Sequence, residues 1–395
     1  MTPQHDSKRL LRAAILRGAL VACLAQSGLA GRAFLCADVP QDLFDGTSLA
    51  GWSLVHDAQF SVKDGKLCLD GGNGWLRTNQ RFRDFALTFE WRALGPSYDS
   101  GLFFRAGLDG KPWPPGYQVN LRHDEVGNLV GVKGAGGPTP ASVKPQGEWN
   151  RFDLRVEGKR AALQINGVDA WKTEALEERD GFIGIQAEVH RFEFRGFHVV
   201  ELGYTDLAEG WNGTTGKHLA PHGAGTWELR KDGVLANSGE AGGWIGTKTA
   251  DWADFSVKLD FRLPRDANSG LFIRSPAEGN PTYDGIEVQL VDDDTTRWQL
   301  RPEQHSGALY GAIAPSRRAT RPAGTWESLE VTAKGSRVEV RMNGLLVVDA
   351  DLAEAVKKTN DASALRDRPR KGHLGLQSSP TGAEFRSLRV RRLDG

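Results

Sequence analysis

Long stretches of the chain alternate between apolar and polar side chains. In residues 85–92 Phe, Leu and Trp take every second position, and in residues 255–262 Phe, Val and Leu do the same. The positions between them hold Ala, Ser, Thr and charged residues. A period of two residues places all apolar side chains on one face of a β-strand. Both segments are therefore expected to form half-buried strands.

The same alternation recurs later in the chain and ends at tight turns. It runs through residues 152–165 to the Asn-Gly pair at Asn166, and through residues 329–342 to the Asn-Gly pair at Asn343. Asn-Gly is typical of two-residue hairpin turns, because both residues tolerate a positive φ. Only residues 351–358 predict a short helix. Since a sheet must bury its apolar face against another sheet, the pattern predicts an all-β protein built from β-sandwiches.

One order of landmarks occurs twice. Each copy has Gly-Trp, a Phe-led strand, Ser-Gly-Leu-Phe-x-Arg, Gly-x-Trp, Asn-Gly and Gly-x-Gln. These landmarks begin at residues 74, 85, 100, 147, 166 and 184 in the first copy and at residues 243, 255, 269, 324, 343 and 375 in the second. A displacement of roughly 170 to 190 residues is the size of a domain, well above that of a solenoid repeat. The chain is thus expected to be a tandem duplication, with one sandwich in residues 38–203 and another in residues 204–395.

Composition excludes several partners and classes of function. The 395 residues include 50 basic and 50 acidic side chains, so nothing favours nucleic acid or an anionic membrane as a partner. The sequence lacks nucleophile elbows, P-loops and spaced Cys/His zinc motifs, which argues against esterases, nucleotide enzymes and zinc proteases. It has 12 Trp and 48 Gly residues. Trp suits large cores and sugar-stacking platforms, and Gly supports tight turns.

The N-terminus is typical of an export signal. Basic residues precede the apolar run of residues 18–25, and small residues that suit cleavage follow it. We expect a signal peptide over residues 1–37 and a secreted or periplasmic protein. Residues 20–23 also resemble a lipoprotein signal, but Arg12 and Arg17 interrupt the apolar stretch before it, so lipidation is not expected. No later segment reaches the ~20 apolar residues that a membrane span needs.

A set of longer motifs runs across both copies. They are Leu43-Phe-Asp-Gly46 with Leu49-x-Gly-Trp52, Gly147-Glu-Trp-Asn150, Gly285-Ile-Glu-Val-Gln-Leu-Val-Asp292, Gly307-Ala-Leu-Tyr310, Ile313-Ala-Pro315, and the repeated Ser-Gly-Leu-Phe-x-Arg and Asn-Gly. Together they resemble the 3-keto-disaccharide hydrolase domain family over essentially the whole mature chain, with one domain per copy. The resemblance implies concanavalin A-like jelly-roll sandwiches, secretion by bacteria that degrade carbohydrates, and action on glycosides already oxidised at C3.

The alternation of side chains between the two faces of a strand indicates one sheet face as a candidate sugar site. In residues 270–274 and 286–290 of the second copy, the apolar sets are expected to face the core, so the remaining side chains share the outer face. A concave sheet that carries amides, an Arg and an aromatic ring is a plausible floor for a sugar, although a solvated strand face is the alternative interpretation. The selected side chains are Phe272, Arg274, Glu287 and Gln289 in the second copy, and Phe103, Arg105, Gln118 and Asn120 in the first, with His123 beside them.

The two copies differ at a position that matters for acid–base chemistry. Glu287 aligns with Gln118, and only a glutamate can accept a proton, so the second copy is the expected catalytic one. The resemblance implies a substrate whose C3 ketone acidifies the C2 proton, so that loss of this proton expels the C1 substituent. The reaction needs a base, a group that stabilises the keto oxygen and an acid for the leaving group. The residues assigned to these roles are Glu287 or Asp292 as the base, Arg274 as the oxygen stabiliser, and His305 or Tyr310 as the acid.

Other interpretations stay open at this point. No cofactor is expected, although the Asp run at residues 292–294 offers hard oxygen ligands to calcium; an exposed turn rich in Asp is the favoured interpretation of that run. The expected partner is a sugar or glycoside. The chain is alternatively a non-catalytic glycan-binding protein, because this sandwich type often serves lectin-like modules, or a pair of spacers without a ligand.

Overall fold

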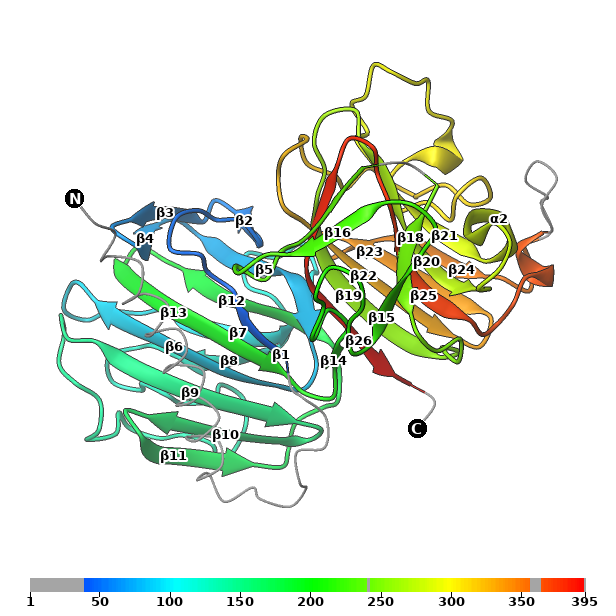
Figure 1. The fold of residues 1–395 in the computed structure, drawn as a ribbon. Coiled ribbons are helices and arrows are strands. Elements are labelled where there is room, and N and C mark those ends of the chain that lie inside the picture. Colours follow the sequence, from blue (N-terminus) through cyan, green and yellow to red (C-terminus); the bar gives the residue numbers. More distant parts are fainter. Residues whose placement is uncertain (1–38, 240–241, 356–363, 394–395) are drawn as a thin grey trace.

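The computed structural model describes residues 39–239, 242–355 and 364–393. They form two β-sandwiches, one from each copy, which lie side by side (Figure 1). The prediction of an all-β protein with two tandem sandwiches is confirmed. The expected signal peptide over residues 1–37 lies outside the described residues. Within the described part of the chain, no helix has the length and apolar character that crossing a membrane requires.

In the first copy, an eight-stranded and a five-stranded antiparallel sheet pack face to face. The large sheet has the order β11-β10-β9-β6-β13-β4-β3 with β1 paired to β13, and the small sheet has the order β2-β5-β12-β7-β8. The strands are β1 (Val39–Asp42), β2 (Trp52–His56), β3 (Gln59–Lys63), β4 (Lys66–Gly71), β5 (Gly74–Phe82), β6 (Phe85–Ala93), β7 (Gly101–Ala106), β8 (Tyr117–Asn120), β9 (Asn150–Glu157), β10 (Arg160–Ile165), β11 (Val168–Thr173), β12 (Gly181–Ala187) and β13 (Phe192–Glu201).

The second copy repeats this arrangement. Its large sheet has the order β16-β17-β26-β19-β22-β23-β24 with β14 paired to β26, and its small sheet has the order β15-β18-β25-β20-β21. Because the strand order is the same, residues at the same place in the register of the two copies can be compared directly. The elements are β14 (Thr205–Asp206), β15 (Leu219–His222), β16 (Thr226–Leu229), β17 (Leu235–Ser238), β18 (Trp244–Thr247), β19 (Phe255–Arg262), β20 (Asn268–Ser275), α2 (Pro281–Asp284), β21 (Ile286–Val291), β22 (Glu327–Lys334), β23 (Arg337–Met342), β24 (Leu345–Asp351), β25 (His373–Gln377) and β26 (Ala383–Arg392).

Each sandwich has its own apolar core between its two sheets. The alternating side chains of β6, such as Phe89, meet those of the small sheet, such as Leu102, in the first copy. Leu259 of β19 and Leu271 of β20 meet in the same way in the second copy. The face that alternation predicted to be apolar is therefore the buried one, and the opposite face of each small sheet is left for other uses.

The structure has its helix in a different place from the predicted one. Residues 351–355, the described part of the expected helix, form the end of β24 and a turn, and the rest lies outside the described residues. The short helix α2 instead precedes β21. Asn280 caps it by accepting a hydrogen bond from the Thr282 amide, and Pro281 occupies its first turn. Four residues are too few to produce a helical period in the sequence, so α2 was not predicted.

The second copy docks on the small sheet of the first through a hairpin turn. The turn between β23 and β24 consists of Asn343 and Gly344. Arg77 of β5 donates a hydrogen bond to the Asn343 carbonyl at 3.2 Å. A Cβ atom on Gly344 would lie 2.5 Å from the Phe182 ring and 2.8 Å from the Asn79 carbonyl. Only a glycine therefore allows this close approach.

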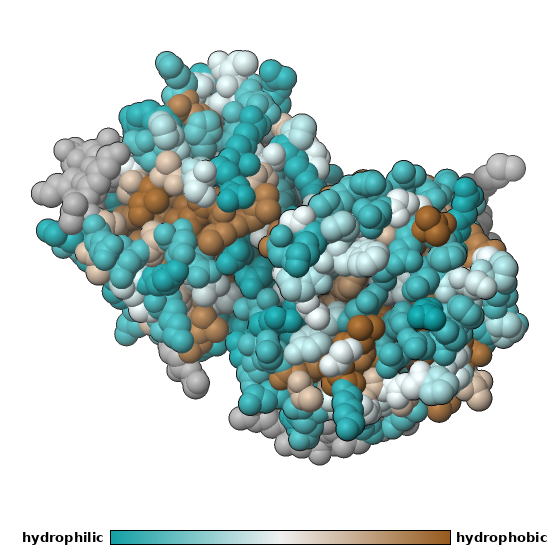
Figure 2. All heavy atoms as spheres, turned by 180° about the vertical axis from the view of Figure 1, so that it is seen from behind, coloured by the Kyte–Doolittle hydropathy of each residue, from teal (hydrophilic) through white to brown (hydrophobic). Residues whose placement is uncertain are grey.

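A buried ion-pair cluster crosses the boundary between the copies. Glu201 at the end of β13 accepts hydrogen bonds from Lys258 Nζ at 2.5 Å and from Arg389 Nε at 2.8 Å. All three residues are at most 1% exposed. Burial disfavours the ammonium of Lys258, but Glu201 raises the pKa of this group above its ordinary value, so Lys258 keeps its charge. Figure 2 shows the two copies as lobes with a mostly hydrophilic surface that meet along one side.

Candidate functional site

The outer face of the small sheet in the second copy carries the central residues of the site that strand alternation predicted. The register places Gly375 of β25 opposite Phe272 of β20, and Phe272 opposite Glu287 of β21. Their sequence neighbours Leu271 and Val288 belong to the core. Since successive side chains of a strand alternate between faces, Phe272 and Glu287 lie together on the outer face.

Glu287 is buried, and the pKa of its carboxyl is raised. Its side chain is 3% exposed. Burial raises the pKa of its carboxyl to about 7, although a hydrogen bond with Thr282 acts in the opposite direction. The carboxyl lies above Gly270, where any Cβ atom would overlap with it. This contact explains the glycine of the Ser-Gly-Leu-Phe motif. A carboxyl group with this pKa can accept or donate a proton near neutral pH.

The helix α2 covers this carboxyl group. Thr282 of α2 forms the hydrogen bond with Glu287. Arg368 fastens the same segment by donating to the Thr282 carbonyl at 3.1 Å and to the Gly285 carbonyl at 2.9 Å. The Glu287 carboxyl is thus almost inaccessible in this arrangement.

Aromatic rings and glycines form the middle of the face. The rings of Trp244 and Phe272 meet edge to face, with centroids 5.8 Å apart. The indole of Trp244 lies over Gly246 and Gly375, where a Cβ atom on either residue would overlap with it. The buried Gln289 accepts a hydrogen bond through its side-chain oxygen from the next backbone amide, at 3.2 Å. An aromatic platform beside an amide and a carboxyl suits a polyhydroxylated ligand.

Contrary to the parity prediction, Arg274 does not lie on this face. The register of β20 and β25 shifts after Phe272, and Arg274 adopts a positive φ of 51°. Its guanidinium donates to the Ala253 carbonyl at 2.6 Å and 2.9 Å and pairs with Asp254 at 3.5 Å. The bulge breaks the alternation on which the prediction depended. Arg274 therefore fastens the loop before β19 and does not reach a ligand on the outer face.

Asp292 and the acidic residues after it point to different partners. Asp292 accepts hydrogen bonds from the backbone amides of Asp266 at 2.9 Å and Asp294 at 3.2 Å. Asp293 accepts from a Thr hydroxyl at 2.8 Å, and Asp294 pairs with Arg318 at 2.6 Å. No cluster of three or more His, Cys, Asp or Glu side chains that would hold a metal occurs in the described parts of the chain. Asp292 thus holds a loop, and the three carboxylates do not converge on one ion.

The two predicted acids occupy different surroundings. The ring of His305 is half-exposed, and its Nδ1 lies 3.1 Å from an oxygen of Asp293. Tyr310 lies next to the candidate base, because its backbone amide donates to the Glu287 carbonyl at 2.9 Å. The Tyr310 hydroxyl accepts a hydrogen bond from Gln304 at 3.1 Å. Backbone pairing therefore brings Tyr310, and not His305, beside Glu287.

Two histidines that the sequence analysis did not select lie on the same face. His222 of β15 pairs with Trp244 in the register, and their rings stack with centroids 3.9 Å apart. The ring of His373 lies 5.5 Å from that of His222, and its Nδ1 is 2.6 Å from the Thr247 carbonyl. Burial and the neighbouring His373 lower the pKa of His222. His373 could have been found in the sequence by comparing the residue two positions before Gly375 with the residue two positions before Gly184 in the first copy.

The corresponding face of the first copy has a neutral amide in place of the glutamate and is closed. Gln118 stands where the second copy has its glutamate, and its amide donates to Gln186. Phe103 is 4% exposed and packs edge to face against Trp75, with ring centroids 5.8 Å apart. The side-chain oxygen of Asn120 accepts from a backbone amide two residues further on, at 3.1 Å. These three predicted residues are brought together, but their polar groups bond within the protein.

The other two residues predicted in the first copy serve elsewhere. Arg105 has a φ of 47° and donates to the Glu177 carbonyl at 2.6 Å while it pairs with Asp84 at 3.1 Å. It is thus a fastening arginine like its counterpart in the second copy. His123 is exposed in the turn after β8, with its ring 6.0 Å from that of Tyr98.

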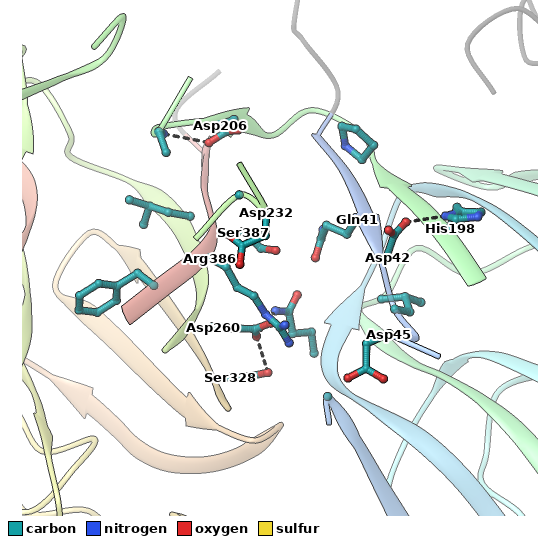
Figure 3. Close-up of a pocket in the computed structure, with 18 of the residues that line it drawn as sticks. Gln41, Asp42, Asp45, His198, Asp206, Asp232, Asp260, Ser328, Arg386 and Ser387 are labelled. Carbon is teal, nitrogen blue, oxygen red and sulfur yellow. Dashed lines mark hydrogen bonds and ion pairs between the residues drawn. The ribbon is translucent and has the colours of Figure 1, made fainter. Parts of the chain in front are cut away.

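A cleft between the two copies forms a second concave feature (Figure 3). It has a volume of about 780 Å³ and is lined by both copies. On one wall His198 Nδ1 lies 2.5 Å from Asp42, and on the other Asp260 bonds to Ser328 at 2.7 Å and to Arg386 at 3.1 Å. Glu287 does not line this cleft. Sequence patterns within one copy carried no information about it, because its walls come from both.

A family model described as the 3-keto-alpha-glucoside-1,2-lyase-like domain matches residues 39–200 and again residues 204–391. The chain belongs to this family. Its two copies are therefore two lyase-like domains in tandem, and the protein is carbohydrate-active.

Solved structures with related sandwiches include two provisionally assigned glycosyl hydrolases from Parabacteroides distasonis ATCC 8503. One is 25% identical with a TM-score of 0.40, covering 49% of this chain and 94% of that chain. The other is 24% identical with a TM-score of 0.39, covering 42% of this chain and 90% of that chain. The carbohydrate-binding module CBM66 from Bacillus subtilis is 16% identical with a TM-score of 0.32, covering 38% of this chain and 96% of that chain. No curated protein matches the chain significantly in sequence.

The two lyase-like domains differ at four equivalent positions that carry titratable groups in the second. The equivalences follow from the register, because the Trp-Gly-Phe path across the small sheet is the same in both domains. Each titratable side chain of the second domain has a counterpart in the first that does not titrate. The pairs are Glu287 and Gln118, Tyr310 and Val130, His373 and Phe182, and His222 and Val55. The capacity for proton transfer on this face is thus concentrated in the second lyase-like domain.

Proposed function

We propose that the second domain cleaves 3-keto-glycosides by removal of the C2 proton and loss of the C1 substituent. The observation that carries this proposal is the Glu287 carboxyl, which is buried on the outer face with its pKa raised to about 7. A base with such a pKa is well matched to a proton that a neighbouring ketone has acidified. The family description supports a 1,2-lyase reaction on a 3-keto-α-glucoside.

In the proposed reaction Glu287 takes the C2 proton, and the electron pair of the C–H bond forms an enolate with the C3 oxygen. When this pair returns, the C1–O bond breaks and a double bond forms between C1 and C2. The departing oxygen takes a proton from a second group, so one protein group gains a proton and another loses one. Addition of water across the double bond then gives the free 3-keto sugar.

Neutral donors replace Arg274 in the proposed stabilisation of the enolate. The side-chain oxygen of Gln289 is engaged with a backbone amide, which leaves the NH₂ group of this residue as a donor. Gln377, which is opposite Trp244 in the register, offers a further amide at the same face. Preorganised amide donors in a site shielded from water stabilise developing oxyanion charge.

The first domain is proposed to support the second without turning over substrate. Its face lacks a titratable residue at each of the four equivalent positions and is covered by the turn at Gly344. We further propose that the export signal expected at the N-terminus takes the protein to the periplasm or outside the cell.

The alternative function is non-catalytic glycan binding, and the cleft between the domains favours it. A volume of about 780 Å³ lined by carboxylates, amides and hydroxyls is of the size that binds small ligands. In that case the chain would bind sugars at the domain boundary, and Glu287 would be a buried carboxylic acid without a reaction.

The test uses the full mature chain and 4-nitrophenyl 3-keto-α-glucoside. We expect the wild-type protein to release nitrophenol, and Glu287→Gln to lower the rate by about 10² to 10⁴, the range in which a general base contributes. The matched control is Gln118→Ala, which changes the equivalent position of the first domain and should keep the wild-type rate. If Glu287→Gln keeps full turnover, the base is another group. Sugar binding by calorimetry without turnover would support the glycan-binding alternative.

A further inference from the structure

We propose that His373 is the catalytic acid that protonates the departing C1 oxygen. This inference rests on the proposed function and adds to it the second proton-transfer group that the reaction requires. The proton moves from Nε2 of the His373 imidazolium to the leaving oxygen as the C1–O bond breaks, while Glu287 holds the proton taken from C2.

A hydrogen bond fixes which nitrogen of His373 can react. The Nδ1 atom lies 2.6 Å from the Thr247 carbonyl oxygen, and a carbonyl can only accept, so Nδ1 carries a proton at all times. The reacting proton is therefore gained and lost at Nε2. A backbone carbonyl that fixes the tautomer in this way is a common feature of histidines that act in proton transfer or as ligands.

The sheet places His373 at a suitable distance from the base. Phe272 of β20 lies between Glu287 of β21 and Gly375 of β25, so Glu287 and Gly375 are two strands apart. His373 precedes Gly375 by two residues. With strand spacings of about 4.8 Å and a rise of about 3.3 Å per residue, the Cα atoms of Glu287 and His373 are about 12 Å apart. The two side chains span part of this separation, and the proposal places one sugar ring across the remainder.

The stereochemistry of an α-glucoside requires such a separation. In its chair, the C2 hydrogen and the C1 oxygen are both axial and point to opposite faces of the ring. A base and an acid that act on them must therefore approach from opposite sides. Glu287 and His373 flank Phe272 from opposite sides. The backbone of Tyr310, in contrast, is hydrogen-bonded to that of Glu287, so Tyr310 lies on the same side as the base.

The first domain shows what the same position becomes when the face is closed. Phe182 replaces His373, and Arg77 fills the place of Gly246 and lies over the Phe182 ring at 4.5 Å. The second domain keeps the histidine, and its Gly246 gives room to the Trp244 indole instead of an arginine. The other predicted acid, His305, is engaged with a carboxylate of a loop.

The experiment separates the two proton transfers in the full chain. Exchange of the C2 hydrogen in D₂O, followed by NMR, reports the base, and release of the C1 substituent reports the acid. Two substrates are compared, methyl 3-keto-α-glucoside and 4-nitrophenyl 3-keto-α-glucoside. Nitrophenolate leaves without a proton, whereas the methoxy group must be protonated by an acid as it leaves. The variants are His373→Phe, which installs the side chain of the first domain, His373→Asn, which keeps a donor to the Thr247 carbonyl, and Tyr310→Phe.

If His373 is the acid, both His373 variants keep C2 exchange and lose at least 100-fold in release of methanol, but much less in release of nitrophenol. A loss that is equal for the two substrates overturns the assignment, as does this leaving-group dependence in Tyr310→Phe instead. If the wild-type protein exchanges no C2 hydrogen and releases neither group, the proposed function fails, and the inference fails with it. His373→Asn decides the outcome if His373→Phe does not fold.

Discussion

Glu287 is buried beside neutral groups, and its carboxyl therefore shifts the stability of the protein with pH. Burial raises its pKa from 4.5 to about 7 in the folded chain. Below about pH 4.5 the group is protonated whether the chain is folded or unfolded. Between these values the unfolded chain binds fewer protons than the folded one, so the stabilisation by the neutral acid declines as pH rises and is lost above the folded pKa.

We expect Glu287→Gln to lack this decline. From about pH 4.5 to about pH 8 the contribution of Glu287 falls by roughly 3 kcal/mol, from the pKa difference at about 1.4 kcal/mol per unit. Urea unfolding of the wild type and the variant across this range measures the difference, and Glu327, whose pKa burial also raises to about 7, cancels because both proteins contain it. Parallel pH profiles of the two proteins would mean that Glu287 is ionised in the folded chain.

Gly270 provides a second test at the residue scale. A methyl group at Gly270 would overlap with the Glu287 carboxyl, and one at Gly101 would overlap with Gln118 in the same way. We expect Gly270→Ala to reduce turnover of a 3-keto-glucoside by at least 10-fold, while Gly101→Ala leaves it within about 2-fold, because in both cases a flexible side chain can move aside and the fold survives. Comparable losses of turnover in the two variants would show that the effect is not local to Glu287.

At this scale alternation predicted one part of the site well. The parity of β20 and β21 placed Phe272 and Glu287 on the outer face, because regular strands have a strict period of two. It failed for Arg274, where a bulge and a positive φ interrupt the period. His222 and His373 were missed because the short strands that carry them lack a long alternating pattern.

At the scale of elements, the two Asn-Gly hairpin turns have the same conformation but different surroundings. Gly167 has a φ of 82° and Gly344 a φ of 81°. A Cβ atom at Gly167 would meet nothing within 4 Å, whereas one at Gly344 would contact the Phe182 ring and the Asn79 backbone of the other domain. The sequence predicted both turns, but not that one of them forms an interface.

We expect Gly344→Ala to destabilise the chain by roughly 1 to 3 kcal/mol more than Gly167→Ala. Both variants have the strain of an alanine at positive φ, about 1 to 2 kcal/mol, but only Gly344→Ala also displaces a packed ring and a backbone carbonyl. Chemical denaturation of the two variants measures the difference directly. Equal destabilisation would mean that the turn does not press on the first domain in solution.

For the whole molecule, the sequence predicted the duplication but not how the two copies dock. Alternation and repeated motifs define each sandwich, because they reflect burial within one domain. Glu201, Lys258 and Arg77 occupy ordinary polar positions of strands, and for each of them it is the neighbouring domain that makes the position interior. A polar residue that faces solvent and one that faces a sister domain have the same pattern in sequence.

The buried charges make the stability of each domain depend on the other. Glu201→Gln leaves Lys258 and Arg389 buried without their carboxylate, so we expect a loss of roughly 3 to 5 kcal/mol in the free energy of unfolding. Replacing Glu201 and Lys258 together by Met should recover part of this loss. Urea titration followed by Trp fluorescence measures both variants. A wild-type midpoint in Glu201→Gln would mean that water reaches the cluster.

The contact through Gly344 joins different surfaces of two similar domains, a turn on one and a sheet face on the other. A contact of this kind is heterologous, and repeating it builds either a ring or an open row of domains, depending on whether the rotation closes. The first domain still presents the equivalent turn, and Val168, which directly follows it, is 55% exposed. The equivalent receiving face of the second domain has Gly246 and His373 in place of Arg77 and Phe182. The receiving face of the second domain therefore lacks the arginine that binds the turn carbonyl in the first domain.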